Sequence, residues 1–198
     1  MKLKLNEGFF LVLESPTGSG KSTLLTVLLP LLQKRFGSDN VVLTQEPWKE
    51  TSTVENRLEG KALLDYVVAD RRAHLHKLVL PSLTARKIVV SSRYYPSALV
   101  YQWGLDNLLF EECWEPNKDF RTPDLTVFLT AAPEVIAARI AARPNKSRFE
   151  QKSYHQAEQT LYLRVADFLE TQDHSILRLD SAQSSPKELA EQLMLNLA

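Results

Sequence analysis

The sequence predicts an α/β fold in which five parallel strands form one sheet with helices on both faces. Five apolar runs of strand length are separated by long segments with the apolar spacing of helices. The runs are apolar throughout rather than alternating with polar residues, as is typical of a parallel sheet covered on both sides. Strands that alternate with helices along the chain indicate a doubly wound sheet. The expected strands are residues 9–13, 41–44, 88–91, 125–129 and 176–179.

Glycine, proline and serine mark the ends of several expected helices. Gly37 follows the first long helical segment, where a helix stop is expected. A first helical turn tolerates proline, because its N–H groups have no partner within the helix. Ser185 is a candidate N-cap for the last helix. Three prolines stand where first turns are expected to begin: Pro96, Pro133 and Pro186.

Composition is that of an ordinary globular protein. Lys plus Arg and Asp plus Glu both number 24, so no net charge favours a polymeric nucleic acid or an anionic membrane. Cys113 is the only cysteine, so no internal disulfide can form, as is usual in a reducing compartment. The apolar run at residues 9–13 is too short for a signal peptide, and the other runs fall short of a membrane span. We therefore expect a cytoplasmic protein.

The order of elements shows no internal repeat, linker or low-complexity tract. We expect residues 1–198 to form a single domain. The segment ARPNKSRFEQKS, residues 142–153, is the most polar stretch between two helical patterns. It is the candidate for a short mobile lid.

The segment SPTGSGKS, residues 15–22, has the spacing of a Walker A phosphate loop, with Ser15 in place of the first glycine. A strand is expected before it and a helix after it, which is the context that such P-loop NTPases require. Lys21 is placed to reach the β- and γ-phosphates, and the Ser22 hydroxyl is placed to bind Mg²⁺. The loop thus predicts a site for ATP and Mg²⁺. The expected nucleotide-binding residues are Thr17, Gly18, Ser19, Gly20, Lys21, Ser22 and Thr23.

Ligands of a doubly wound sheet bind at the carboxyl ends of its strands. Three acidic side chains fall at such ends: Glu14, Glu46 and Asp180. Glu46 is the best placed of the three for contact with an acceptor or with Mg²⁺-bound water. We therefore count Glu46 among both the catalytic and the substrate-binding candidates.

From the segment FLVLESPTGSGKST, which begins at residue 10, to about Tyr162, the chain resembles the thymidylate kinases, a family of P-loop nucleoside-monophosphate kinases. The resemblance is carried by TQEP, VVADRRAH, SRYYPSALVYQ, PDLTVFLTAAPEVIAARIAAR and SRFE, in this order along the chain. It implies transfer of the γ-phosphoryl of Mg·ATP to a nucleoside monophosphate, with dTMP as the expected acceptor. It also implies a homodimer.

The resemblance implies roles for individual residues. Arg71 and Arg93 would hold the acceptor monophosphate, and guanidinium forks suit phosphate oxygens. Arg139 would lie on the ATP side, with Arg143 and Arg148 at the lid, where they would close on the transferred phosphoryl. The base and sugar pocket would be lined by Tyr66, Val67, Ser97, Tyr101 and Gln102.

Some of these residues also fit a purely structural role. Arg71 and Arg72 suit the solvated face of a long helix. Arg139 and Arg143, four residues apart on a helix, suit surface positions. Tyr101 suits the core as well as it suits a ligand site.

The chain departs from the family pattern at several site positions. Thr17 and Ser92 stand where the family usually has acidic residues. Val67 stands where it commonly has an aromatic residue that stacks on the base, and Ala98 stands where it often has a polar residue that contacts the edge of the base. Ser92 predicts a weaker or more permissive kinase, because serine supplies no charge beside Mg²⁺. A monophosphate acceptor is already largely ionised, with a second pKa near about 6, and needs no general base.

Two other functions fit parts of the pattern. Glu46 followed by Pro47 and Trp48 is similar to the deoxynucleoside kinases, in which a glutamate takes the proton of the sugar 5′-hydroxyl. The absence of acids at Thr17 and Ser92 also suits a nucleotide-binding protein without catalysis.

Overall fold

The computed structural model describes residues 7–49, 58–142 and 155–197, and it confirms the predicted parallel sheet. The strand order is β2-β3-β1-β4-β5, and every pairing is parallel. Each expected strand is present and runs one residue further at its carboxyl end. The strands are β1 (Phe9–Glu14), β2 (Val41–Gln45), β3 (Ile88–Ser92), β4 (Leu125–Thr130) and β5 (Ile176–Asp180).

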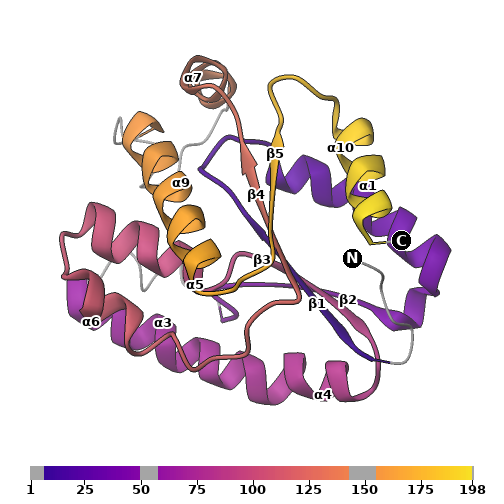
Figure 1. Cartoon of the computed structure of the whole chain (residues 1–198), viewed down its shortest axis with the longest axis horizontal. Helices are drawn as coiled ribbons and strands as arrows, with labels where there is room; N and C mark the ends of the chain where they lie inside the picture. The colour runs from indigo at the N-terminus through magenta and orange to yellow at the C-terminus, as the bar shows by residue number, and fades with distance from the viewer. Residues whose placement is uncertain (1–6, 50–57, 143–154, 198) are drawn as a thin grey trace.

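Helices cover both faces of the sheet, as predicted (Figure 1). One face carries α1 (Lys21–Phe36) and α10 (Pro186–Asn196), which pack side by side. The other carries α3 (Gly60–His74), which continues as the π-helical turn η2 (Leu75–Val79) into α4 (Leu80–Thr84). The remaining elements are η1 (Ser38–Asn40), α5 (Tyr95–Ala98), the π-helical η3 (Leu99–Leu105), α6 (Phe110–Trp114), α7 (Pro133–Ala141) and α9 (His155–Thr171).

Alternate residues of the strands enter two different hydrophobic cores. Phe10 and Val12 of β1 pack in the core beneath α3, η3 and α9, whereas Leu11 and Leu13 pack in the core beneath α1 and α10. All four side chains are fully buried. A fully buried apolar side chain of this size contributes about 1.5 to 3 kcal/mol, so both helical layers are held firmly to the sheet.

The predicted helix ends are confirmed. Gly37 has a positive φ and follows α1, and its N–H donates to the Gln33 carbonyl. Ser185 caps α10 by accepting a hydrogen bond from the N–H of Glu188. The predicted prolines lie in first turns: Pro96 in α5, Pro133 in α7 and Pro186 in α10.

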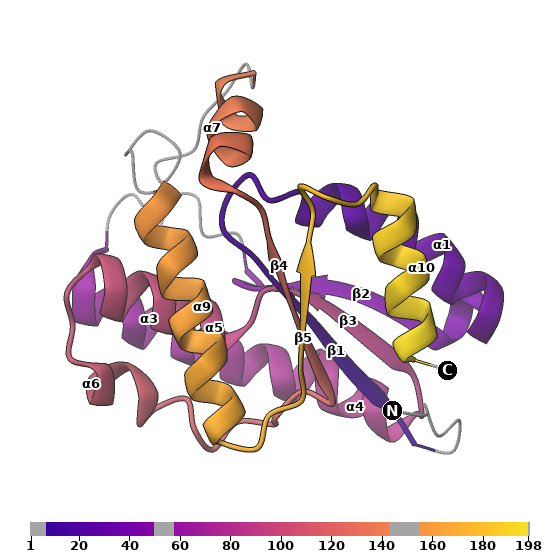
Figure 2. The ribbon, with the colours of Figure 1, turned by 45° about the horizontal axis from the view of Figure 1, so that its top comes forward.

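The carboxyl ends of the strands open toward α7 and the first turn of α9. Figure 2 shows α7 beyond the end of β4, with α9 running back along the sheet. The predicted lid, residues 142–153, lies outside the described residues except for Ala142, which follows the last turn of α7. Among the described helices, none combines the length and apolar character that a membrane span needs.

Candidate active site

The phosphate loop lies between β1 and α1, as the sequence predicts. Gly18 and Gly20 have φ angles of 90° and 93°, a region that side chains disfavour. A Cβ atom on Gly18 would lie only 3.0 Å from the side chain of Ile140 in α7. The packing of α7 against the loop therefore also requires glycine at position 18. Ser15 is buried and is not among the described non-glycine residues with positive φ, so a serine fits at this position.

Lys21 begins α1, and its ammonium donates a hydrogen bond to the Ser92 hydroxyl at the end of β3. Burial and the charge of Arg93 lower the pKa of Lys21, while the charge of Glu14 opposes this shift. Ser22 is exposed and lines a groove of about 470 Å³ together with Ser92. A lysine, an exposed hydroxyl and a helix N-terminus at one point fit a Mg²⁺-bound polyphosphate. Ser22 is the residue that would bind the metal.

Arg139 of α7 contacts the phosphate loop. Its guanidinium donates to the Ser19 carbonyl at 3.3 Å, to Ser181 Oγ at 2.9 Å and to the Ser181 carbonyl at 2.8 Å. Ser181 Oγ in turn donates to the Ser19 carbonyl at 2.6 Å. These bonds join α7, the loop and the end of β5 around a cavity of about 320 Å³, which is also lined by Gly20 and Thr23.

Arg93 directly follows β3 with a φ of 75°, which is strained for a residue with a side chain. Its N–H donates to the Leu13 carbonyl at 2.9 Å, which holds the strained residue against β1. Its guanidinium donates to the hydroxyls of Tyr162 at 2.6 Å, Tyr101 at 2.9 Å and Ser97 at 3.3 Å. Arg93 therefore lies at the centre of a hydroxyl-lined site beside the phosphate loop.

Glu14, at the end of β1, is fully buried behind Arg93. Its carboxylate accepts hydrogen bonds from the Tyr94 N–H at 2.7 Å and from Ser97 Oγ at 2.6 Å. Burial raises the pKa of Glu14 to about 7, although these two bonds and the charges of Arg93 and Lys21 oppose the shift. The carboxylate thus holds the Tyr94–Ser97 turn in place.

Glu158 of α9 is a second buried carboxylate at this site, with 2% of its surface exposed. It accepts hydrogen bonds from the N–H and hydroxyl of Thr17 and from the hydroxyl of Tyr101. Burial opposes ionisation of Arg93, but the pKa of Arg93 is raised by its neighbours Tyr101, Tyr162, Glu14 and Glu158. Arg93 therefore stays charged inside the site.

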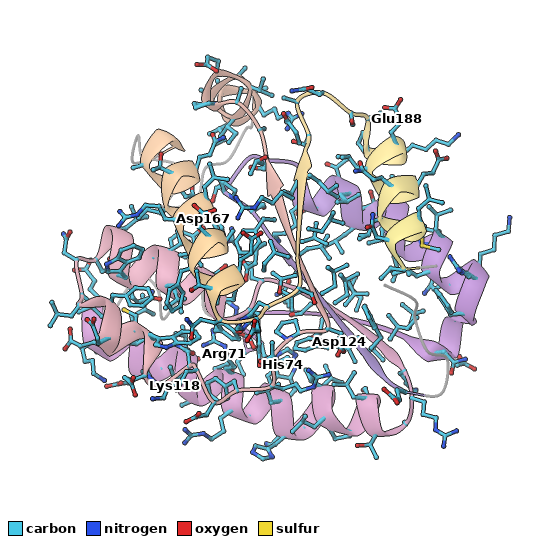
Figure 3. All side chains as sticks on the ribbon, in the orientation of Figure 1. Arg71, His74, Lys118, Asp124, Asp167 and Glu188 are labelled. Carbon is cyan, nitrogen blue, oxygen red and sulfur yellow. The ribbon has the colours of Figure 1, made fainter. Side chains whose placement is uncertain are left out.

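A second network joins β2 to α3 (Figure 3), with Arg71 and His74 on the side of α3 that faces the sheet. Arg71 Nε donates to Glu46 Oε2 at 2.7 Å, and His74 Nδ1 lies 3.1 Å from Glu46 Oε1. Arg71 Nη1 donates to the Asn117 side chain, and His74 Nε2 lies 2.8 Å from the Thr44 hydroxyl. The side chains of Arg71 and Glu46 are only 3% and 4% exposed, so this ion pair is buried.

The turn after β2 covers this network. The Asp70 carboxylate accepts hydrogen bonds from the N–H groups of Trp48 at 2.6 Å and Lys49 at 3.2 Å. The Trp48 ring stacks on His74, with centroids 5.6 Å apart. Trp48 therefore closes the buried network from outside.

The structure separates the predicted residues into groups. Arg71 is buried, so the alternative prediction that it lies on a solvated helix face is wrong. Arg72 is exposed, as that alternative predicts. Glu46 contacts Arg71 and His74, which brings it to the α3 side. Ser97 and Tyr101 contact Arg93, Lys21 lies at the end of the phosphate loop, and Arg139 contacts the loop at Ser19.

The remaining predicted residues are more peripheral or fall outside the described chain. Tyr66 and Val67 are half-buried on α3, and Val67 packs against the core. Gln102 is buried in η3. Arg143 and Arg148 lie outside the described residues, so their predicted roles are not tested.

Three residues of the site were missed from the sequence: Glu158, Tyr162 and Asn117. Burial of Glu158 could have been predicted, because its spacing places it on the same helix face as the buried apolar residues 161, 162, 165 and 169. An acid on the apolar face of a helix needs a buried partner. Asn117 follows α6, and no sequence pattern around it predicts its contact with Arg71.

Comparisons with known proteins agree with this geometry. The family model described as thymidylate kinase matches residues 13–193. A thymidylate kinase of Bacillus cytotoxicus is 37% identical over 183 residues, covering 81% of this chain and 85% of that protein. One of Leptospira borgpetersenii is 35% identical over 173 residues, covering 82% and 83%.

The fold has a close counterpart among solved structures. The thymidylate kinase of Ehrlichia chaffeensis superposes with a TM-score of 0.70 at 22% identity, covering 95% of this chain and 99% of that one. At this identity the structural match supports the fold, while the family follows from the sequence matches. The chain belongs to the thymidylate kinase family of P-loop nucleoside-monophosphate kinases.

Proposed function

We propose that the protein transfers the γ-phosphoryl group of Mg·ATP to dTMP, forming dTDP and ADP. The observation that carries this proposal is the position of Arg93. Its guanidinium lies beside the phosphate loop, at the end of the strand whose last residue, Ser92, contacts Lys21. The loop that would bind the ATP phosphates and the arginine that would bind the acceptor phosphate follow neighbouring strands, β1 and β3. This arrangement suits a direct transfer between two phosphate groups.

Transfer between phosphates requires alignment and charge compensation rather than a general base, because the acceptor is already largely ionised at neutral pH. The loop amides and Lys21 would hold the β- and γ-phosphates, and Ser22 would bind Mg²⁺, which neutralises charge on the transferred group. Arg93 would hold the acceptor phosphate. Arg143 and Arg148 would complete the charge clamp.

The other predicted residues divide between donor and acceptor. Arg139, with Thr17 to Thr23, would bind ATP around the 320 Å³ cavity. Ser97, Tyr101 and Gln102 would line the pocket of the acceptor, and Tyr66 and Val67 would flank its base. Arg71 and Glu46 are proposed on the acceptor side as one ion-paired unit.

The deoxynucleoside kinase alternative requires Glu46 to act as a free base. Both Glu46 oxygens face Arg71 and His74 in the described structure, an arrangement that suits a positioning role better. We therefore keep the monophosphate as the proposed acceptor.

The decisive experiment is an ADP-release assay with Mg·ATP and a panel of nucleosides and nucleoside monophosphates. We expect turnover with dTMP above all other acceptors. Turnover with nucleosides alone would establish the deoxynucleoside kinase, and nucleotide binding without turnover would establish a protein without catalysis. Another monophosphate as the best acceptor would correct the base but keep the reaction.

The family also motivates two proposals about the whole molecule. We propose a cytoplasmic location and a homodimer. Cell fractionation tests the first, and sedimentation equilibrium tests the second, for which a species of about 22.5 kDa would contradict the dimer.

A further inference from the structure

Glu158 joins two parts of the site that are far apart in the sequence. Its Oε1 atom accepts hydrogen bonds from the Thr17 N–H at 3.0 Å and the Thr17 hydroxyl at 3.2 Å. The same atom accepts a hydrogen bond from the Tyr101 hydroxyl at 2.8 Å. Thr17 belongs to the phosphate loop, and Tyr101 belongs to η3 on the acceptor side. One carboxylate oxygen therefore bridges the two sides.

The bridge extends to Arg93. The Tyr101 hydroxyl that donates to Glu158 also accepts a hydrogen bond from Arg93 Nη1 at 2.9 Å. The Arg93 guanidinium lies over the Tyr101 ring, 5.3 Å from its centroid. A displacement of the Glu158 carboxylate would therefore move the loop and the arginine relative to each other.

We propose that Glu158 is a positioning residue that sets the phosphate loop at a fixed distance from Arg93 for phosphoryl transfer. In-line transfer requires the reacting atoms to be held about 3 to 3.5 Å apart, and small misplacements lower the rate strongly. The side chain is buried, and its Oε1 atom accepts all three hydrogen bonds, so the contact with the loop and Tyr101 is well defined. This inference rests on the proposed kinase function.

The contact between residues 17 and 158 allows a test in which the carboxylate is moved. Glu158→Gln removes the charge and keeps the shape, and we expect kcat with dTMP to fall about tenfold to a hundredfold. The KM for ATP should change less than kcat does. Thr17→Asp places a second carboxylate against Glu158, and we expect it to lower kcat as well, because like charges repel at this distance.

The double variant gives the sharpest readout. In the Glu158→Gln background, Thr17→Asp returns one carboxylate to the same contact, and the glutamine amide can donate to it. We expect kcat to recover at least about tenfold relative to Glu158→Gln, so the effect of Thr17→Asp reverses sign. Glu170→Gln, on the far end of α9 in an exposed ion pair, is the matched control and should leave kcat unchanged.

Thermal unfolding of each variant separates positioning from stability. If Glu158→Gln lowers the melting temperature but keeps kcat within about twofold, Glu158 only stabilises the fold and the inference is wrong. Failure of the double variant to exceed Glu158→Gln overturns it as well. An inactive wild-type protein would instead refute the proposed function, on which the inference depends.

Discussion

The phosphate loop at residues 15–23 and the proposed acceptor side around Arg71 and Arg93 are built differently. On the loop side, glycine torsions, main-chain groups and a helix N-terminus create the site, and Arg139 donates a hydrogen bond to the Ser19 carbonyl. On the acceptor side, buried charged groups hold one another through side chains. Local sequence dictates the glycine torsions and the helix N-terminus of the first arrangement, whereas the ion pair of Arg71 and the Arg93–Tyr162 contact of the second join residues 25 and 69 positions apart.

This difference has an energetic consequence. A glycine-rich loop loses mainly binding when one side chain is removed, because its backbone keeps its shape. A buried ion pair leaves an uncompensated charge when one partner is removed, which destabilises the protein. Substitutions on the two sides should therefore affect activity and stability in different proportions.

The largest effect on activity is expected for Lys21→Ala. Loss of this ammonium removes charge from the β- and γ-phosphates, and phosphoryl transfer should fall at least about a thousandfold. The melting temperature should not fall, since Lys21 is a partly buried cation whose charge is disfavoured by its surroundings. A coupled ADP-release assay with thermal unfolding checks both. Full activity in a folded variant would remove the phosphate-loop assignment.

The largest effect on stability is expected for Arg71→Ala. Its loss leaves the Glu46 carboxylate buried without its main partner, and unfolding free energy should fall by about 3 to 5 kcal/mol. Arg72→Ala removes the exposed neighbour on the same helix and should change stability by less than about 0.5 kcal/mol. Urea unfolding compares the two, and equal losses would mean that the Arg71–Glu46 pair is not a stabilising element.

Arg93→Ala should separate the two sides by ligand. We expect dTMP affinity to fall about a hundredfold, as for loss of a buried charged hydrogen-bonding group, with a much smaller effect on ATP. Arg139→Ala should show the opposite preference, because Arg139 contacts the phosphate loop. Calorimetric titration of each ligand with each variant checks this. Equal losses of affinity for dTMP and ATP would show that Arg93 and Arg139 are wrongly assigned to separate binding sites.

Ser92→Asp tests the missing acid next to Lys21. An added carboxylate should organise Mg²⁺ and its waters and raise kcat with dTMP by about tenfold, with little change in ATP affinity. The gain is limited because an aspartate would also hold the Lys21 ammonium, which now contacts Ser92. If the wild-type enzyme already turns over at about 1 to 100 per second and the variant is slower, the metal is organised elsewhere. Glu46→Gln would then be the next variant to measure.

The smallest effect is the pH dependence that Glu14 gives to stability. Burial raises the pKa of this carboxyl to about 7 from 4.5, so between these values the folded protein binds more protons than the unfolded chain. The contribution is therefore present below pH 4.5 and is lost as pH rises toward 7. Glu14→Gln should flatten the fall in stability across this window.

A contrasting glutamate serves as the control for this measurement. The N-cap hydrogen bonds of Ser185 lower the pKa of Glu188, so its contribution is lost as pH falls below its usual range. Glu188→Gln should consequently lower stability above this range and abolish the loss at the acid end, while leaving the slope between about pH 5 and 7 unchanged. Denaturant unfolding of both variants from pH 4 to 8 distinguishes the two, and an unchanged slope in Glu14→Gln would refute the shifted carboxyl.

Much of the fold was predictable because its signals are local. Each strand is an apolar run, several helix ends carry a glycine, proline or serine, and the loop between β1 and α1 is a contiguous motif. The same holds for Lys21 and Ser22, whose positions follow from the motif itself.

The partners of the charged groups were decided by the tertiary structure. Arg71 and Arg72 are adjacent in the sequence and alike in chemistry, yet only the fold buries the first against Glu46 and Asn117. Glu158 reaches Thr17 across 141 positions, a pairing that no local pattern specifies. The physical reason is that backbone torsions and apolar periodicity act over a few residues, whereas a buried charge is matched only when the packed helices bring its partner to it.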